Sequence, residues 1–262
     1  MNNQNLRSTQ PSEYQELLQP IGAMSKHFSD GHQIGYHHHK RDQLLFAVSG
    51  VMRLRTKEGA WIVPPVGAVY IPSGVQHSVG MHGDVDMRTL YIDPLKTRKG
   101  GQLFRNLKVI SVSNLLRELI LALCAEPLQY ETGSRGYRIA QMFEQEILAA
   151  PELLLHILLP KDKRLQILCA NLLADPSDRR TLAIWSQTVG ASTRTLSRLF
   201  ESELGMSFNQ WRQRVRFHSS LGALSNGMPI SKVAFDNGYN SPSAFTAAFS
   251  KVMGMSPSRF LN

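Results

Sequence analysis

Apolar residues change their spacing along the chain, and this change divides it into regions. Between residues 43 and 92 they come in short runs, which Gly and Pro separate about every ten residues. Residues 53–56 alternate between apolar and polar, as a strand with one buried face does. Short strands spaced in this way are typical of a small antiparallel barrel or jelly roll. The predicted strands cover residues 43–56 with a break at 49–50, 60–63, 68–71 and 85–92.

From residue 113 onward the apolar spacing becomes helical. Ser113 or Asn114 suits an N-cap, and a stripe of Leu and Ile residues follows up to residue 123. A second helix is expected from 134 to 150, and both helices either pack on the barrel or carry a dimer interface. Residues 151–160 predict a strand or a linker, and a further helix is expected from 165 to 173.

The stretch from 182 to 260 contains one pattern twice. In each copy an apolar stripe ends at a glycine, Gly190 or Gly238, and a serine, Ser192 or Ser241, opens the next stripe. The offset between the copies is 48 residues at the glycines and 49 from the serines onward, so the second turn is one residue longer. This agreement in spacing indicates an internal repeat of two supersecondary units.

Each copy has the order of features of a helix-turn-helix. The glycine supplies the left-handed residue that ends a helix, and the serine is a good N-cap for the next one. Two ordinary helical hairpins are the alternative, but two copies in register favour DNA binding. The expected DNA-contacting residues lie outside the apolar stripes: Thr193, Arg194, Thr195, Ser197 and Arg198 in the first copy, and Ser241, Ser243, Ala244, Thr246, Ala247 and Lys251 in the second.

A basic helix is expected to join the two copies. Residues 208–225 contain no proline, and their only glycine is Gly222. Eighteen helical residues span about 27 Å, close to the roughly 34 Å between successive major-groove faces on one side of B-DNA. One chain would therefore hold two neighbouring groove segments. Arg212 and Arg214 are expected at phosphates, and packing of this helix is the alternative for both and for Arg216.

The positive charge lies with the repeat. The chain carries a formal net charge of +9. Residues 161–262 hold 13 Lys and Arg against 6 Asp and Glu, which gives +7, and the rest of the chain, 16 against 14, gives +2. A basic domain of this kind is the electrostatic footprint of a nucleic-acid-binding protein.

The repeat resembles the C-terminal domain of the AraC/XylS family of bacterial transcription regulators. The matching positions include Leu196 to Phe200 in the first copy and Gly238-Tyr239 and Gly254 to Pro257 in the second. Trp185 and Ser186 depart from the family's usual Leu and Ala. The short side chains of the second reading helix suggest apolar contacts to thymine methyl groups. The resemblance covers about 100 of the 262 residues and implies a sequence-specific DNA-binding regulator.

A group of histidines in the barrel region resembles the two motifs of the cupin barrel. The resemblance implies that His37, His39, Gln43 and His77 surround one divalent metal such as zinc, nickel or copper. Gln43 stands where cupins have Glu, and Met81 stands where the second motif usually ends in Asn. Because Gln is a neutral and weak ligand, a barrel that has lost its metal is the alternative.

A small-molecule effector pocket is expected inside the barrel, where such sites are common. A metal-dependent cupin enzyme with an accessory nucleic-acid domain is the alternative function, but the nearest acid, Asp42, alternates away from Gln43. We expect no enzymatic activity. The residues expected around the effector are His37, His39, Gln43, Phe46, Trp61, Tyr70, His77 and Tyr91.

The composition of the chain indicates the cellular compartment in which the protein is expected. Cys124 and Cys169 are isolated among apolar residues, which favours buried thiols over a redox pair. Residues 1–19 are polar and lack the apolar core of a signal peptide, and no apolar run approaches 18 residues. We therefore expect a cytoplasmic protein with no membrane association. A double-stranded RNA binder lacks any supporting module.

The sequence as a whole predicts an α+β multidomain protein. A mobile N-terminal arm (1–17) precedes a cupin-like antiparallel barrel (18–110), a helical dimerisation region (111–160) and an all-α DNA-binding domain (161–262). The two helix-turn-helix units are placed at about 181–204 and 229–253. We expect a homodimer that binds double-stranded promoter DNA and a small-molecule effector, with activation and repression both open.

Overall fold

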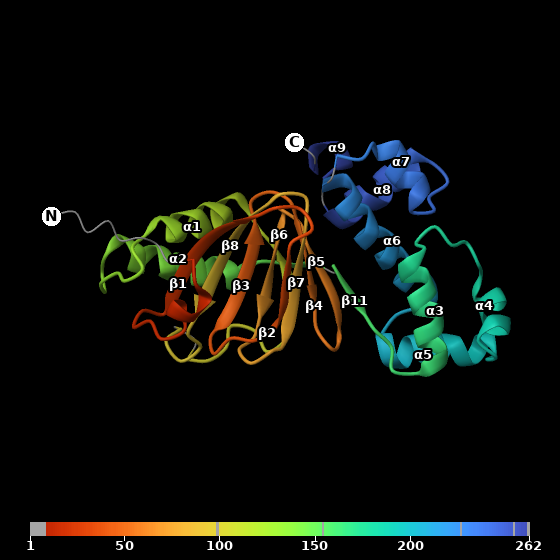
Figure 1. The fold of residues 1–262 in the computed structure, drawn as a ribbon, viewed down its shortest axis with the longest axis horizontal. Coiled ribbons are helices and arrows are strands. Elements are labelled where there is room, and N and C mark those ends of the chain that lie inside the picture. Colours follow the sequence, from red (N-terminus) through yellow and green to blue (C-terminus); the bar gives the residue numbers. More distant parts are fainter. Residues whose placement is uncertain (1–8, 98–99, 154, 226, 254, 261–262) are drawn as a thin grey trace. The chain divides into compact units, whose positions relative to one another are not determined.

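The computed structural model describes residues 9–97, 100–153, 155–225, 227–253 and 255–260. The chain forms two compact units (Figure 1). The first consists of Met1–Lys57 and Trp61–Leu154, and the second of Glu58–Ala60 and Leu155–Asn262. The limit expected from the sequence, between 160 and 161, falls inside the second unit. Among the described residues, no helix is long and apolar enough to cross a membrane.

Two antiparallel sheets make up the first unit, as predicted. One has the strand order β1-β8-β3-β6-β9-β10, and the other contains β5-β4-β7-β2. The non-consecutive neighbours are the crossovers of a jelly-roll-like fold. The strands are β1 (Ile21–Phe28), β2 (Gln33–His37), β3 (Asp42–Ala47), β4 (Val51–Arg55), β5 (Gly59–Val63), β6 (Gly67–Ile71), β7 (His77–His82), β8 (Val85–Ile92), β9 (Lys108–Ser111) and β10 (Glu152–Leu153).

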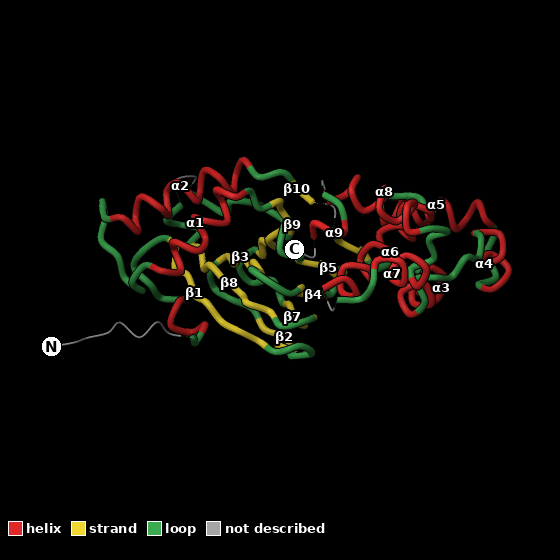
Figure 2. Tube along the Cα trace, turned by 90° about the horizontal axis from the view of Figure 1, so that it is seen from above, coloured by secondary structure: helices red, strands yellow, loops and turns green. Residues whose placement is uncertain are grey.

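The core of the first unit lies between the β1-β8-β3 sheet and two helices. Helices α1 (Asn114–Ala125) and α2 (Arg135–Ala149) cover one face of this sheet (Figure 2). Ser113 and Ser134 are their N-caps, and each hydroxyl accepts the backbone N–H of the third helical residue, Leu116 or Tyr137. The buried apolar stripes of both helices therefore pack against the barrel. The core includes Leu44, Phe46, Tyr70, Leu90, Ile92, Leu116, Ile120, Phe143 and Ile147.

Strand β3 is buried on both faces. Leu44 and Phe46 belong to the core beneath the helices, whereas Gln43 and Leu45 line a cavity on the other face. This division follows from the two-residue period of a strand. Because all six residues are buried, β3 lacks the polar-out alternation of a surface strand.

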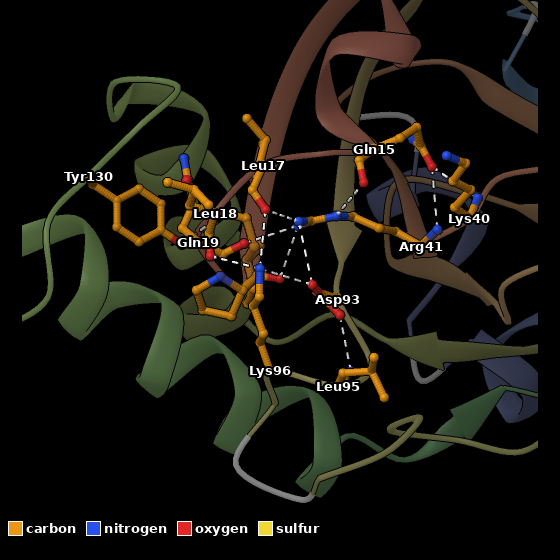
Figure 3. Close-up of polar contacts among 12 residues, drawn as sticks. Gln15, Leu17, Leu18, Gln19, Lys40, Arg41, Asp93, Leu95, Lys96 and Tyr130 are labelled. Carbon is orange, nitrogen blue, oxygen red and sulfur yellow. Dashed lines mark hydrogen bonds and ion pairs between the residues drawn. The ribbon is translucent and has the colours of Figure 1, made fainter.

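A buried arginine anchors the N-terminal segment to the barrel (Figure 3). Arg41 is 3% exposed, and its guanidinium donates to the carbonyls of Gln15, Leu17, Gln19 and Pro20. It also lies 3.6 Å from the Asp93 carboxylate. These bonds replace the water that a buried guanidinium loses.

A 3₁₀ turn precedes this anchor. The turn covers Pro11–Tyr14, and the Tyr14 ring is 1% exposed and packs 5.5 Å from the Tyr91 ring. Residues 1–8 lie outside the described residues. The mobility expected of residues 1–17 stays a prediction, but Tyr14 and Leu17 are part of the packed barrel.

The second unit is helical apart from β11 (His156–Leu158), which lies beside residues 58–60 of the same unit. Its core gathers Trp185, Leu196, Phe200 and Trp211. The helices are α3 (Lys163–Ala174), α4 (Leu182–Thr188), α5 (Thr193–Leu204), α6 (Phe208–Ser225), α7 (Ile230–Asp236), α8 (Pro242–Met253) and α9 (Pro257–Phe260).

The repeat signals predict these helices well. Helix α6 has the limits expected from the sequence, and Gly190 and Gly238 have φ of 65° and 73°. Gly254, part of the family signature, and the side chain of Val252 lie outside the described residues. The two cysteines are free and buried, as expected.

Candidate functional site

The first helix-turn-helix consists of α4 and α5. Thr181 and Ser192 cap the two helices through their hydroxyl groups, and Trp185 of α4 and Leu196 of α5 are buried in the common core. Gly190 is left-handed in the turn, which any other residue adopts only with strain. These local signals fix which face of α5 points to solvent.

The solvent face of α5 carries the residues expected at DNA. Thr193, Arg194, Ser197 and Arg198 are exposed, and Thr195 is partly covered and hydrogen-bonds with Ser192. Neither arginine makes a hydrogen bond or an ion pair among the described residues. An exposed, unengaged pair of guanidinium groups on one helix is suited to phosphates or guanine edges.

The second helix-turn-helix consists of α7 and α8, and its reading face is less basic. Ser241 caps α8 through a bond from the Ala244 N–H, and Ser243, Ala244 and Ala247 are exposed. Thr246 is partly buried, and the exposed Lys251 lies in the last turn of the helix. Small side chains of this kind fit contacts to thymine methyl groups better than bidentate base pairing.

The arginines of α6 are engaged within the protein. Arg212 donates to the Arg180 carbonyl and to Asn209, and Arg214 donates to Nε2 of His156 at 3.1 Å. Arg216 is 8% exposed and donates to the carbonyls of residues 176 and 178. All three arginines therefore take part in packing the connecting helix, which was the alternative to phosphate contact that the sequence left open.

The strand β11 is tied to this same helix. Trp211 Nε1–H donates to the Leu158 carbonyl at 3.0 Å, and the ring is fully buried. Because a guanidinium only donates, the bond from Arg214 requires an unprotonated Nε2 on His156. Burial, and next the Arg214 charge, lower the pKa of His156 to about 4.

A cavity of about 280 Å³ opens between the two sheets of the first unit. Of the eight residues expected around an effector, His37, His39, Gln43 and Tyr91 line it. The remaining lining residues come mainly from strands that the sequence pattern did not reveal. They are Pro11, Met24, Lys26, Phe28, His32, Gln33, Ile34, Leu45, Val79 and Met87.

The other four expected residues, Phe46, Trp61, Tyr70 and His77, are not among those that line the cavity. Phe46 and Tyr70 belong to the core beneath the helices. They lie on the face of the sheet opposite to the one that carries Gln43 and Tyr91. Trp61 is buried but is not among the residues that line the cavity. Of the four aromatic residues expected there, Tyr91 is the one that lines the cavity.

Strand β1 supplies a cavity wall that sequence reasoning missed. Met24, Lys26 and Phe28 alternate along β1 and all line the cavity. Lys26 is the charged residue on this side of β1, and its Nζ lies 5.3 Å from the centre of the Phe28 ring. The period-two spacing of these three residues was the available signal.

Three histidines lie together beside this cavity: His37 and His39 line it, and the ring of His77 packs against both of theirs. His37 and His77 are register partners on β2 and β7, with ring centres 4.4 Å apart, and His39 lies 4.9 Å from His37. One ligand nitrogen from each lies within 4.8 Å of the other two. The sequence prediction thus grouped His37 and His39 with His77, which lies 38 residues after His39 in the chain.

The environment favours neutral imidazoles. Burial, and next the neighbouring His37, lower the pKa of His39 to about 3. Burial lowers the pKa of His77 to about 4, although a bond from its ring to the Val75 carbonyl opposes this shift. At neutral pH both rings therefore keep a free lone pair, which is the form that binds metals.

Gln43, the fourth expected ligand, lines the same cavity and is held through its amide nitrogen. It donates from Nε2 to the Thr89 hydroxyl at 3.0 Å, and its Oε1 is buried without a hydrogen-bond partner in the described structure. Asp42 points to the other side of β3, where it accepts from the Tyr70 hydroxyl and the Ser73 N–H. The acid that the enzyme alternative needed is therefore engaged away from the cavity.

Comparisons with known proteins match both units. Residues 25–149 match the sequence model of a family described as AraC-like ligand binding domain, and residues 185–262 match that of a helix-turn-helix domain. Among the solved structures, ToxT from Vibrio cholerae matches with a TM-score of 0.39 and 13% identity, covering 93% of this chain and 98% of that one.

Two regulators of Escherichia coli (strain K12) are similar in sequence. The HTH-type transcriptional regulator NimR is 30% identical over 225 residues, which are 86% of this chain and 81% of that protein. The arabinose operon regulatory protein is 33% identical over 103 residues, 38% of this chain and 35% of that protein. The chain therefore belongs to the AraC family of DNA-binding transcription regulators, with an AraC-like ligand-binding domain.

Proposed function

We propose that this regulator reads promoter DNA with α5 and α8 and that a small molecule in the barrel cavity changes this binding. The observation that carries the first half is the contrast between two groups of arginines. Arg194 and Arg198 on α5 are exposed and unengaged among the described residues, whereas those on α6 bond within the protein. Base reading is therefore assigned to α5.

The two reading helices divide the recognition. Arg194 and Arg198 suit guanine edges or phosphates, with Thr193, Thr195 and Ser197 beside them. On α8 the reading surface is formed by Ser243, Ala244, Thr246 and Ala247, and Lys251 is assigned to a phosphate. Helix α6, 18 residues and about 27 Å long, would set the spacing between the two grooves.

Binding to the promoter region beside its own gene tests this assignment. Fluorescence anisotropy would compare the wild type with Arg198→Ala at several salt concentrations. A bidentate base contact is worth about 1–3 kcal/mol, so we expect a loss of roughly 5- to 150-fold on the specific site and a smaller loss on scrambled DNA. Arg164→Ala is the matched control, because it removes the same charge from α3, where Arg164 pairs with Asp162.

Two outcomes would contradict the proposal. Equal losses for Arg198→Ala on specific and scrambled DNA would make α5 a general basic surface. An equal loss for both variants would place recognition outside α5. The salt slope adds an independent measure, because each lost phosphate contact lowers it by about 0.9.

The cavity is the proposed effector site because it is concave, largely apolar and enclosed by two sheets. Filling it with Leu45→Phe is expected to leave DNA affinity unchanged and to abolish the effector response of a promoter reporter. A promoter response that survives the filled cavity would place the effector elsewhere. As a regulator of promoters, the protein is proposed to act in the cytoplasm.

We also propose a homodimer that uses the outer faces of α1 and α2. Their buried stripes pack on the barrel, but Leu115, Met142 and Leu148 are 51%, 44% and 42% exposed. Sedimentation velocity on the wild type and on Leu148→Glu measures this directly. A monomeric wild type, or a dimer that Leu148→Glu leaves intact, would contradict the assignment.

A further inference from the structure

We propose that His37, His39 and His77 bind one divalent transition-metal ion and that its open coordination positions take an anionic group of the effector. The inference deepens the proposed function, since it names the chemistry of the ligand in the same cavity. Metal and anion binding are measured without DNA, so their failure is distinguishable from a failure of the proposed function.

The hydrogen bonds of two rings direct their free nitrogens to a shared ligand. His37 Nδ1 lies 2.8 Å from the Gly35 carbonyl, and His77 Nδ1 lies 2.8 Å from the Val75 carbonyl. A carbonyl only accepts, so Nδ1 carries the proton in both rings and Nε2 carries the lone pair. Backbone bonds that fix the tautomer in this way are usual at metal-binding histidines.

Buried polar atoms at this place lack partners. Nε2 of His39, Nε2 of His77 and Oε1 of Gln43 are all buried and have no hydrogen-bond partner in the described structure. An unpartnered buried polar atom costs about 1–3 kcal/mol, and three such atoms in one place are uncommon in a folded domain. A metal held by the two imidazoles would remove two of these costs together.

The three imidazoles fit a small coordination sphere. Zinc binds imidazole nitrogen at about 2.0–2.1 Å, so tetrahedral ligands lie about 3.4 Å apart. The ligand nitrogens lie within 4.8 Å of one another, so the rings would close by up to about 1.4 Å. Imidazole suits zinc, copper and nickel, and three protein ligands leave at least one position for an exogenous group.

Charge selects the kind of group that completes the site. Three neutral imidazoles leave the full +2 charge of the metal uncompensated. Among the described residues that line the cavity there is no Asp or Glu, whereas Lys26 adds a further positive charge. A carboxylate or a similar small anion is therefore the group that both the metal and the Lys26 ammonium favour in this cavity. The cavity volume of about 280 Å³ limits this effector to a small molecule.

Titration of the metal-free full-length protein with Co²⁺ tests the metal site, by calorimetry and by visible d–d absorption. We expect one Co²⁺ per chain and a loss of at least about 100-fold in affinity for His77→Ala and for His37→Asn. His38→Ala is the matched control, because His38 is an exposed neighbour outside the cluster and should leave affinity unchanged. Because His37 is only partly buried, His37→Asn should fold even if the buried position of His77 does not tolerate alanine.

Titration of the Co²⁺-loaded protein with azide tests the anion. We expect azide to shift the d–d bands, and Lys26→Met to weaken azide binding about tenfold while Co²⁺ binding is kept. Lys57→Met, which removes an exposed charge away from the cavity, should change neither. Absence of stoichiometric Co²⁺ binding, or equal binding by His77→Ala, would overturn the metal site. A Co²⁺ spectrum that azide leaves unchanged would overturn the anion position.

Discussion

The two turns of the repeat offer a matched pair of glycine substitutions. Gly190 and Gly238 hold the same place in their helix-turn-helix units and are both left-handed, with φ of 65° and 73°. A Cβ added at Gly190 meets nothing within 4 Å. At Gly238 the Cβ would lie 2.6 Å from Nη2 of Arg216 and 3.0 Å from the Ser177 carbonyl oxygen. Glycine to alanine should therefore lower the free energy of unfolding more at position 238 than at position 190.

The magnitudes follow from these surroundings. Alanine in the left-handed region costs about 1–2 kcal/mol, which is the whole expected cost of Gly190→Ala. Gly238→Ala also displaces the Arg216 guanidinium, whose Nη2 donates to the Asp178 carbonyl at 3.2 Å. A lost bond from a charged donor adds about 1.5–3 kcal/mol, so we expect a total of about 2.5–5 kcal/mol.

Urea unfolding followed by tryptophan fluorescence measures the difference. Trp185 and Trp211 lie in the second unit, and a Trp61→Phe background removes the signal of the first. At a slope of about 2 kcal/mol per molar urea, an extra 2 kcal/mol moves the midpoint by about 1 M. Equal midpoints for the two alanine variants would refute the argument that Arg216 braces the second turn.

Three further changes probe separate parts of the structure. Because its folded pKa of about 4 lies below the unfolded value of 6.5, His156 contributes stability that is full above pH 6.5 and is lost as pH falls towards 4. His156→Gln keeps an acceptor for Arg214, so its unfolding free energy should depend less on pH across this window. Trp211→Phe leaves the partly buried Leu158 carbonyl without its donor and should lower that free energy by about 1–3 kcal/mol, measured by urea unfolding. Phe46→Ala should destabilise the first unit by about 3–5 kcal/mol in calorimetry, and a cost below 1 kcal/mol would contradict its place in the core.

The helix-turn-helix repeat was predictable because its signals are local. Ser192 and Ser241 cap helices within three residues of themselves, and Gly190 and Gly238 adopt the backbone conformation that their residue type favours. The limits of α6 followed from the absence of helix breakers. None of these inferences required knowledge of a distant contact.

The cavity was predictable only in part, because alternation does not say which face of a strand is inside. Phe46 and Tyr70 were expected at the effector with Gln43 and Tyr91, but β3 is buried on both sides and its two faces serve different neighbours. Lys26 disguised β1, since a cation facing a cavity resembles a surface residue in the sequence. The three histidines were found through a resemblance of motifs.

The two faces of β3 contact different parts of the first unit, and this has an evolutionary consequence. Leu44 and Phe46 hold the helices in place, and a change there is exposed to selection for folding. Gln43 and Leu45 line the cavity proposed for the effector, so mutations there can accumulate under selection for a new effector with little effect on the scaffold. Neighbouring codons of one strand can thus drift at different rates, and a duplicated gene could acquire a new signal while its promoter-binding half stays under its old constraint.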